Sequence, residues 1–363
     1  MCMCRTENDT LIDEKIYKIN ILYEFNAGAY GGANQFLKAM KKELKKTGRY
    51  TDDIVEADVI IFNSWNDAQK LIKIKKKYPR KIFVHRVDGP CKLYNNPHDR
   101  RDDIIYALNN AVADGTVFQS TYSREASIKM GISRNKYETV ITNAVDSDIF
   151  YPKKKCVLDK TKKIKIIASS FSSNPKKGFD VYKYMDEKLD FDKYDMVFVG
   201  NSPITFQNII QKPAMPSAEL AKELRDSDIY ITGSRKEACS NSLIEAQMCG
   251  LPAIVINDGS HLELIGKAGE AFNNLGEIFE LLDKIIQNYE YYVSNINRQT
   301  IAEVADSYYK FCSRIIKDSE NKKYYIKKLT IRKKIIVHYM LACYKITTKK
   351  DALIGKLKSK GIV

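Results

Sequence analysis

The sequence predicts an α/β protein built from two doubly wound domains that face each other across a cleft. At 363 residues the chain is too long for one small core and fits two domains of ordinary size. Short β-branched runs alternate with longer helical stretches, which is typical of a parallel sheet covered by helices. The alternation stops at a polar, lysine-rich segment, residues 153–162, and restarts directly after it, as expected at a domain boundary.

The first half of the chain supplies five expected strands and one clear helix. The helix is expected over residues 31–46, because Phe36, Leu37, Met40 and Leu44 fall on one face at helical spacing. The strands are expected at residues 16–25, 59–63, 82–87, 115–119 and 139–142.

The second half repeats the pattern. Strands are expected at residues 163–168, 196–200, 229–232 and 253–257, and helices at 179–188, 217–225, 242–249, 275–288 and 297–316. We therefore expect an N-terminal domain over residues 1–155, a C-terminal domain over 156–318 and a tail over 319–363.

The net charge of +15 is concentrated in this tail. Residues 319–363 hold 13 Lys and Arg against the two acids Glu320 and Asp351, a net of +11, which leaves +4 for the other 318 residues. Apolar residues alternate with the basic clusters at roughly helical spacing, so the tail is expected to be a basic amphipathic helical segment. Such a segment either lies on an anionic membrane or packs on the body with its charges in water. Nucleic acid is the third possible partner of a basic chain.

A loop between residues 233 and 241 is the strongest candidate for chemistry. It follows the expected strand 229–232 and leads into the helix at 242, so it lies at the carboxyl edge of a parallel sheet, where α/β proteins bind ligands. The backbone N–H groups of Asn241, Ser242 and Leu243 open that helix and suit a diphosphate. Glu237 lies in the loop, and Glu245 lies in an apolar stretch of the helix, where burial is costly unless the carboxyl binds a partner.

These residues carry a resemblance. Glu237, seven residues and Glu245, followed by Gly250-Leu251-Pro252, resemble the E-x7-E signature of family 4 glycosyltransferases. The resemblance implies the GT-B fold, two Rossmann-like domains around a cleft, and transfer of a sugar with retention of configuration.

Other segments resemble the same family in the same order and extend the resemblance over roughly residues 15–315. They are the stretch 143–152, which closes the family's first domain, the Lys177-Gly178 pair of the K-G motif, and the glycine-rich loop with Gly28, Gly31 and Gly32. Phe171 occupies the position where the family usually has an arginine, and Lys176 is a candidate to supply that charge.

The resemblance implies a role for each donor-side residue. Lys177 would neutralise the leaving diphosphate, Glu237 would bind hydroxyls of the donor sugar, and Glu245 would hydrogen-bond the nucleotide ribose. The remaining donor-binding candidates are Gly178, Asn241, Ser242, Leu243, Gly31, Gly32 and Glu263.

The sequence leaves two candidates for the residue that faces the sugar on the acceptor side. The family tends to carry a histidine at the end of a strand in the first domain, facing the sugar, and either His85 or Asp88 could take that place. Arg86 and Asp88 are expected on the acceptor side. The catalytic candidates are thus Glu237, Lys177, Asp88 and His85.

No cofactor or metal ion is expected, because no D-x-D motif lies at a suitable strand end and a clamp of cations and helix dipoles can hold a diphosphate alone. The expected partners are a nucleotide sugar, a glycan or lipid-linked acceptor, and an anionic membrane that residues 319–363 contact peripherally. The rival interpretations are a nucleotide-sugar epimerase or phosphorylase of the same fold, and a basic nucleic-acid-binding protein, which the nearly neutral body disfavours.

The location expected from the sequence is the cytoplasm, at the inner face of a membrane. No signal-peptide pattern opens the chain, and no run of about 18 uncharged apolar residues could span a bilayer. The eight cysteines are scattered, which is typical of reduced thiols.

Overall fold

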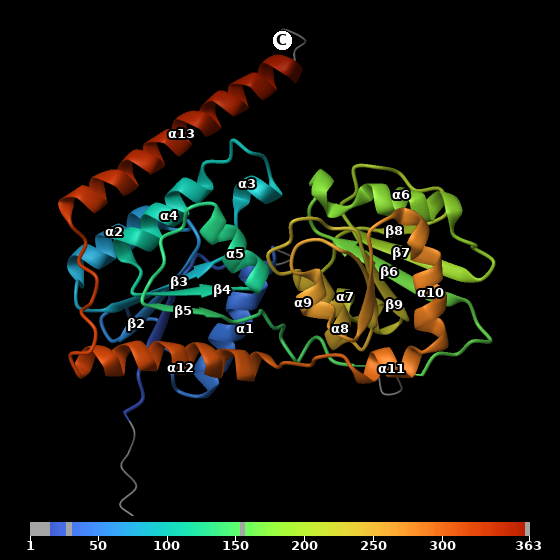
Figure 1. Ribbon diagram of the computed structural model, residues 1–363, viewed down its shortest axis with the longest axis horizontal. Coiled ribbons are helices and arrows are strands. Elements are labelled where there is room, and N and C mark those ends of the chain that lie inside the picture. The colour runs from blue at the N-terminus through green and yellow to red at the C-terminus, as the bar shows by residue number, and fades with distance from the viewer. Residues whose placement is uncertain (1–14, 27–30, 153–156, 360–363) are drawn as a thin grey trace, which may run out of the picture.

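A five-stranded parallel sheet forms the core of the first domain (Figure 1). The computed structural model describes residues 15–26, 31–152 and 157–359, so Gly28 and residues 153–156 lie outside the described residues. The strands are β1 (Ile19–Leu22), β2 (Val59–Asn63), β3 (Ile82–Val87), β4 (Gly115–Phe118) and β5 (Tyr137–Val140), in that order across the sheet. The helices are α1 (Gly32–Lys46), α2 (Ala68–Lys77), α3 (Cys91–Tyr94), α4 (Arg101–Val112) and α5 (Thr121–Lys129).

The first sheet is doubly wound, as predicted. Tyr50 pairs with Ile19 as an isolated parallel bridge, so the chain leaves β1 through α1 before it crosses to β2. Leu37 of α1 packs in the cluster on one face of the sheet, and Leu71 of α2 packs in the cluster on the other face. The winding direction therefore reverses at β1, and such a switch point opens a crevice at the carboxyl ends of the strands.

The second domain holds a six-stranded parallel sheet with the order β11-β10-β9-β6-β7-β8. Its strands are β6 (Ile164–Ser170), β7 (Tyr194–Gly200), β8 (Ile210–Lys212), β9 (Ile229–Thr232), β10 (Ala253–Ile256) and β11 (Gly269–Phe272). Its helices are η1 (Pro175–Lys177), α6 (Phe179–Lys188), α7 (Ser217–Arg225), α8 (Asn241–Met248), α9 (His261–Ile265), η2 (Leu275–Glu277), α10 (Ile278–Gln287) and α11 (Tyr289–Ser294). The winding reverses between β6 and β9, which gives this sheet its own switch point.

Helix α12 (Ile301–Glu320) returns to the first domain and corrects one predicted boundary. The sequence placed residues up to 318 in the second domain. Val304, Tyr308 and Ile315 instead pack in the cluster formed by α1 and the first sheet. The helix begins with a complete capping box between Thr300 and Glu303, which fixes where the chain turns back.

The tail folds as a long helix, α13 (Ile331–Ser359), which packs along α4 of the first domain (Figure 1). Val337 is fully buried there, and Met340 and Leu341 pack against the same cluster. The ring of Tyr344 lies 5.4 Å from that of Trp65, measured between centroids. In the described part of the chain, no helix combines the length and hydropathy that crossing a membrane requires.

Candidate active site

A cavity of about 270 Å³ opens where the switch points of the two sheets face each other. We call it the inter-domain cavity. Gly31, Gly32 and Gln35 line it from the start of α1, and the second domain supplies the ends of β6 and β7 and the start of α8. The charged and polar lining residues from the second domain include Ser169, Ser170, Lys177, Glu237, Asn241, Ser242 and Glu245. The structure thus brings most of the predicted donor-side residues to one place.

Lys177 and Glu237 form a tight ion pair in this cavity. Lys177 follows β6 and Glu237 follows β9, and the ammonium Nζ lies 2.6 Å from the carboxylate Oε1. Burial alone would lower the pKa of Lys177, but the charge of Glu237 raises it above its usual value. Burial would raise the pKa of Glu237, yet Lys177 and the Ser234 hydroxyl hold it below its usual range. Both groups are therefore charged at neutral pH.

The positive charge of the cavity comes from a single side chain. Among the described residues that line it, Lys177 is the only cation. Phe171, which stands where the family usually has an arginine, lines the cavity and is 52% exposed. Lys176 donates its ammonium hydrogen bond to the backbone carbonyl of Leu93 in the first domain, so it does not supply the missing charge in this arrangement.

Two of the predicted glycines are needed for packing between chain segments. Gly178 has a φ of +79°, and a Cβ there would lie 2.3 Å from the backbone of Gly233. The glycine thus allows the loop after β6 to touch the loop after β9, and Gly178 itself does not line the cavity, contrary to its predicted contact with the donor. A Cβ on Gly32 would lie 1.9 Å from the side-chain Nδ2 of Asn241, so Gly32 permits close approach of the two domains.

Helix α8 begins at the cavity. Asn241 and Ser242 line it, whereas the Leu243 side chain is fully buried in the core of the second domain. The first N–H groups of a helix have no acceptor within the helix, and they carry its positive dipole end. An anion in the cavity would meet this end of α8 on one side and Lys177 on the other.

Glu245 lies one turn further along α8 and lines the same cavity. No described side chain donates a hydrogen bond to its carboxyl group, and burial raises its pKa to about 8. An unpartnered carboxyl in a cavity is costly to retain. It is therefore available to a ligand that carries hydroxyl groups.

Replacing Glu245 by Gln should change how stability depends on pH. The folded-state pKa of about 8 lies above the ordinary value of 4.5, so between these values the folded state binds more protons than the unfolded state. The free energy of unfolding of the wild type should therefore fall as pH rises through this window. Thermal unfolding between pH 5 and pH 8 should show an advantage of Glu245→Gln that grows with pH. Parallel curves for the two proteins would contradict a raised pKa.

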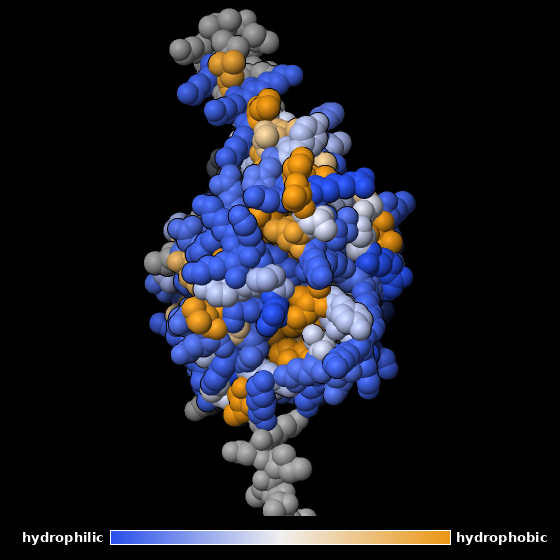
Figure 2. Space-filling model, turned by 90° about the vertical axis from the view of Figure 1, so that its left-hand side faces the viewer, coloured by the Kyte–Doolittle hydropathy of each residue, from blue (hydrophilic) through white to orange (hydrophobic). Residues whose placement is uncertain are grey.

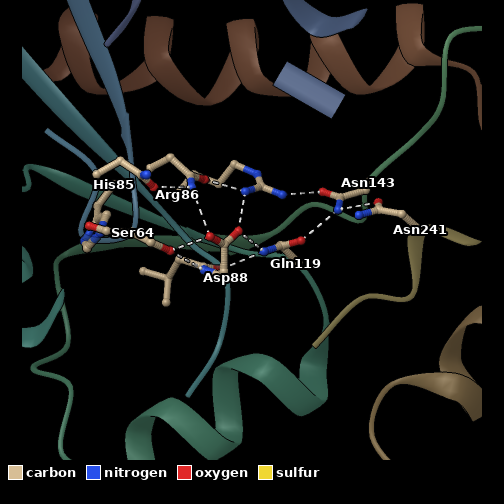
Figure 3. Close-up of polar contacts among 10 residues, drawn as sticks. Ser64, His85, Arg86, Asp88, Gln119, Asn143 and Asn241 are labelled. Atoms are coloured by element: carbon tan, nitrogen blue, oxygen red, sulfur yellow. Dashed lines mark hydrogen bonds and ion pairs between the residues drawn. The ribbon is translucent and has the colours of Figure 1, made fainter. Parts of the chain in front are cut away.

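Asp88 is the centre of a hydrogen-bond network in the first domain (Figure 3). Its Oδ1 accepts from Arg86 at 2.5 Å and from Gln119 at 2.7 Å. Its Oδ2 accepts from Ser64 at 2.7 Å and from Asn63 at 2.9 Å. Burial would raise the pKa of Asp88, but the Arg86 charge and these hydrogen bonds lower it. Because all four donors favour the carboxylate, Asp88 is poorly suited to take up a proton in this arrangement.

The network continues into the second domain. Asn143 accepts a hydrogen bond from Arg86 at 2.9 Å and donates to Gln119 at 2.7 Å. It also donates to Asn241 Oδ1 at 3.0 Å, so it links the first domain to the start of α8 (Figure 3). The Arg86 side chain is fully buried within this network, so the prediction that it faces the acceptor is wrong here. Arg86 instead positions Asp88 and Asn143.

His85 points into the interior of the first domain. Its ring nitrogens lie 3.1 Å from Asn109 Oδ1 and 2.9 Å from the Ser64 carbonyl oxygen, and the ring stacks on Phe62. The residue has no exposed surface, and burial lowers its pKa to about 4. His85 does not line the inter-domain cavity or the neighbouring cavity that contains Asp88, so its predicted place against the sugar is not supported. Of the two open choices, the structure brings Asp88 to the cleft.

A second cavity of about 270 Å³ adjoins the first and contains Asp88. Glu237, Cys239 and Asn241 line both cavities, so they form the wall between them. The other polar residues that line the second cavity are Tyr94, Asn95, Arg101, Gln119 and Lys236. Two adjoining cavities with Glu237 at their boundary can hold two reactants side by side.

Glu263 bridges the two domains instead of lining a cavity. Its carboxylate accepts hydrogen bonds from the backbone N–H groups of Thr121 at 2.8 Å and Tyr122 at 2.7 Å. These groups open α5 of the first domain, where a carboxylate also meets the favourable end of the helix dipole. The predicted contact of Glu263 with the donor is therefore absent here, because its oxygens are held by α5.

Several residues of the site were not among the residues predicted from the sequence. Gln119 and Asn63 hold Asp88, and the Tyr94 ring centroid lies 5.3 Å from the Lys177 ammonium. Each lies near the carboxyl end of a strand or in a short helix that follows one, which is the general signal that could have drawn attention to them. Within the described ranges, no group of three or more His, Cys, Asp or Glu residues is arranged to hold a metal ion.

Solved structures identify the fold as GT-B. HepE from Anabaena, solved with UDP-glucose, matches 84% of this chain and 99% of its own with a TM-score of 0.59 at 15% identity. Sucrose-phosphate synthase from Thermosynechococcus elongatus matches 92% of this chain and 100% of its own with a TM-score of 0.59 at 11% identity. The catalytic domain of starch synthase IV from Arabidopsis thaliana, bound to ADP and acarbose, matches 79% of both chains with a TM-score of 0.55 at 13% identity.

Sequence comparison matches the second domain to a protein family. Residues 152–300 match the family described as glycosyl transferases group 1. An uncharacterized 41.2 kDa protein in the cps region of Klebsiella pneumoniae is 28% identical over an alignment of 184 positions, which covers 47% of this chain and 51% of that protein. The chain thus spans about half the length of the curated relative that it matches. The matched family segment contains Lys177, Glu237 and Glu245.

Proposed function

We propose that the protein is a retaining glycosyltransferase of family 4, which moves a sugar from a nucleotide diphosphate sugar to a hydroxyl acceptor. The observation that carries the proposal is the inter-domain cavity, in which Lys177, Glu237, Glu245 and the start of α8 meet between two switch points. The match of residues 152–300 to group 1 glycosyl transferases supports the same activity.

The donor would lie across the inter-domain cavity. Its diphosphate would take the place between Lys177 and the first N–H groups of α8, which together would offset part of its negative charge without a divalent cation. Glu245, which has no hydrogen-bond donor in the described chain, would accept from the ribose hydroxyls. Glu237 stands at the wall to the second cavity and would bind hydroxyls of the donor sugar.

The acceptor would enter the second cavity, beside the sugar. In a front-face reaction its hydroxyl oxygen bonds to the anomeric carbon as the bond from that carbon to the diphosphate breaks. The departing diphosphate takes up the hydroxyl proton on the same face, which retains the configuration. The protein contributes by holding the two reactants together and by stabilising the leaving charge. Asp88 then has a positioning role in the wall of the cleft, because both of its carboxylate oxygens already accept hydrogen bonds from neighbouring side chains.

The pathway that we propose for this activity is based on the genomic region of the Klebsiella relative. The Klebsiella protein lies in a cps region, and HepE was solved with UDP-glucose, so we infer a role in surface polysaccharide synthesis with a glycan or lipid-linked acceptor. Such an enzyme would work in the cytoplasm, at the inner face of the membrane. The nearly neutral body, at +4 without the tail, argues against a nucleic-acid-binding function.

A nucleotide screen tests the proposal. Ligand binding raises the unfolding temperature by mass action, so UDP, GDP or ADP and the matching sugar nucleotide should each stabilise the protein. The stabilising sugar nucleotide, incubated with glycan or lipid-linked hydroxyl acceptors, should release its nucleotide in an acceptor-dependent manner, also in the presence of EDTA. Absence of any nucleotide shift would refute the site, and isomerisation of the sugar without an acceptor would indicate an epimerase.

A further inference from the structure

Helix α13 has two apolar faces, and only one of them packs on the protein. The inner face, with Val337, Met340, Leu341 and Tyr344, covers α4 and its neighbours. The second face, which we call the outer stripe, consists of Ile331, Ile335, Tyr339, Ile346 and Leu353. These five side chains are 80%, 62%, 62%, 68% and 59% exposed.

The outer stripe runs along one side of the helix and is interrupted by Lys349, between Ile346 and Leu353. Its members follow one another at intervals of four or seven residues, which places them on one side of an α-helix. From Ile331 to Leu353 the stripe is about 33 Å long at a rise of 1.5 Å per residue. Lys334, Lys345 and Lys356 recur every eleven residues along one border, and Arg332 and Lys350 flank the other. An apolar stripe between two basic borders is the pattern of a helix that lies in a membrane interface.

A second feature adjoins the outer stripe. A groove of about 750 Å³ lies between α2 and the segment that joins α12 to α13, and we call it the basic groove. Five of its lining residues are cations without an ion pair to any described residue, and no described lining residue is acidic. The cations are Lys76, Arg80, Lys322, Lys328 and Lys334, and the apolar lining residues are Tyr324, Tyr325, Ile326, Leu329 and Ile331. Ile331 and Lys334 belong to the groove and to α13, so the two features form one surface.

Figure 2 shows this face of the molecule. Hydrophobic residues appear along α13 and in the hollow below it, within a surface that is otherwise hydrophilic. A protein surface rarely leaves five large apolar side chains aligned in water without a partner.

The cations and the apolar side chains of this surface together indicate which class of partner it binds. Nucleic acid would satisfy the cations but would leave the Ile335 and Ile346 side chains without an apolar contact. A second copy of α13 would cover the stripes but would bring the same basic borders together, which is repulsive. An anionic phospholipid bilayer offers an apolar phase for the stripe and phosphate groups for the borders and the groove.

We propose that the outer stripe of α13 and the basic groove form a docking surface for anionic phospholipid. The stripe enters the acyl boundary of one leaflet, and the groove holds a lipid phosphate between its five cations. The surface lies apart from the two cavities of the candidate active site, so this inference is independent of the chemistry proposed there.

Vesicle flotation of the full-length chain tests the proposal. Binding to vesicles of phosphatidylcholine with phosphatidylglycerol should exceed binding to pure phosphatidylcholine at least tenfold, and should weaken as salt rises. Ile335→Ser/Ile346→Ser should lower binding at least tenfold, and Arg80→Gln/Lys328→Gln should lower it several-fold. Lys183→Gln/Lys193→Gln, which removes two exposed charges from the second domain, should bind like the wild type.

Three results would overturn the proposal. They are unchanged flotation of the stripe variant, equal binding to neutral vesicles, and displacement from anionic vesicles by an equal phosphate concentration of a DNA or RNA oligonucleotide. Exposed side chains are replaced, so each variant should retain the circular dichroism spectrum and unfolding temperature of the wild type. Vesicle binding in a protein that no nucleotide stabilises would refute the proposed transferase and leave the docking surface standing.

Discussion

Lys177→Ala should lower kcat for the proposed sugar transfer by about 10²- to 10³-fold, which is the cost of losing one preorganised charge at a leaving group. Lys177 is the only cation among the described residues of the inter-domain cavity, which the start of α8 also lines. No other described residue that lines this cavity is a cation, Phe171 is uncharged, and the Lys176 ammonium is engaged by the Leu93 carbonyl. The rate of nucleotide release from the sugar nucleotide measures the effect.

The same variant should identify the phosphate as the group that Lys177 holds. The affinity advantage of the nucleoside diphosphate over the free nucleoside should shrink about tenfold or more, while nucleoside affinity stays nearly constant. Loss of the lysine also leaves Glu237 unpaired, so Lys177→Ala/Glu237→Gln separates a folding defect from loss of phosphate binding. Lys183→Ala, an exposed lysine on α6, is the matched control and should keep wild-type kinetics. A kcat within threefold of the wild type in Lys177→Ala would refute its assigned role.

The overall architecture was largely predictable because both sheets are built from buried, β-branched strands. Seven-residue β6 and its neighbours read as apolar runs, and the restart of the pattern after residue 162 located the second domain. Strand β8, with the sequence Ile-Gln-Lys, and strand β11, with Gly-Glu-Ala-Phe, were missed. Both are short edge strands of mixed polarity that exist because a neighbouring strand offers free backbone groups.

Long-range contacts explain the errors in the site. Glu237 and Glu245 could be chosen from the sequence because they lie in one strand–loop–helix segment. Lys177 could be chosen because Lys177-Gly178 resembles the K-G motif of the family. His85 and Arg86 lie on a strand buried on both faces, so alternation along the strand cannot show which side chain faces the cleft. Their orientation is decided by partners elsewhere in the chain.

Glu263 and helix α12 were misplaced for the same physical reason. Glu263 is held by N–H groups of α5, more than 140 residues earlier in the chain. Helix α12 has a strong amphipathic pattern, but this pattern does not say which of two apolar cores receives it. An amphipathic pattern in a sequence shows that one face of a helix must be buried. Only the fold determines which core that face packs against.

Asp114 joins the tail to the first domain, because its carboxylate contacts residues of both. Its carboxylate lies 3.5 Å from the ammonium of Lys75, and neither side chain has any exposed surface. It also accepts hydrogen bonds from the Tyr324 hydroxyl at 2.8 Å and from the backbone N–H of Lys327 at 2.7 Å. The segment that leads from α12 to α13 is therefore fixed to the end of α4 by a buried charge.

Asp114→Asn should lower the free energy of unfolding of the first domain by about 3–5 kcal/mol, because it leaves the buried Lys75 ammonium without a counter-charge. Trp65, the only tryptophan of the chain, contacts Tyr344 of α13, so its fluorescence during urea unfolding reports on this domain and on the docking of the tail. Lys75→Met/Asp114→Asn should recover part of the loss, since it removes both charges. Asp52→Asn breaks the pairs with Lys41 and Lys45 at a side chain that is 63% exposed and should cost less than about 1 kcal/mol. Equal effects of Asp114→Asn and Asp52→Asn would show that the buried pair does not hold the tail in place.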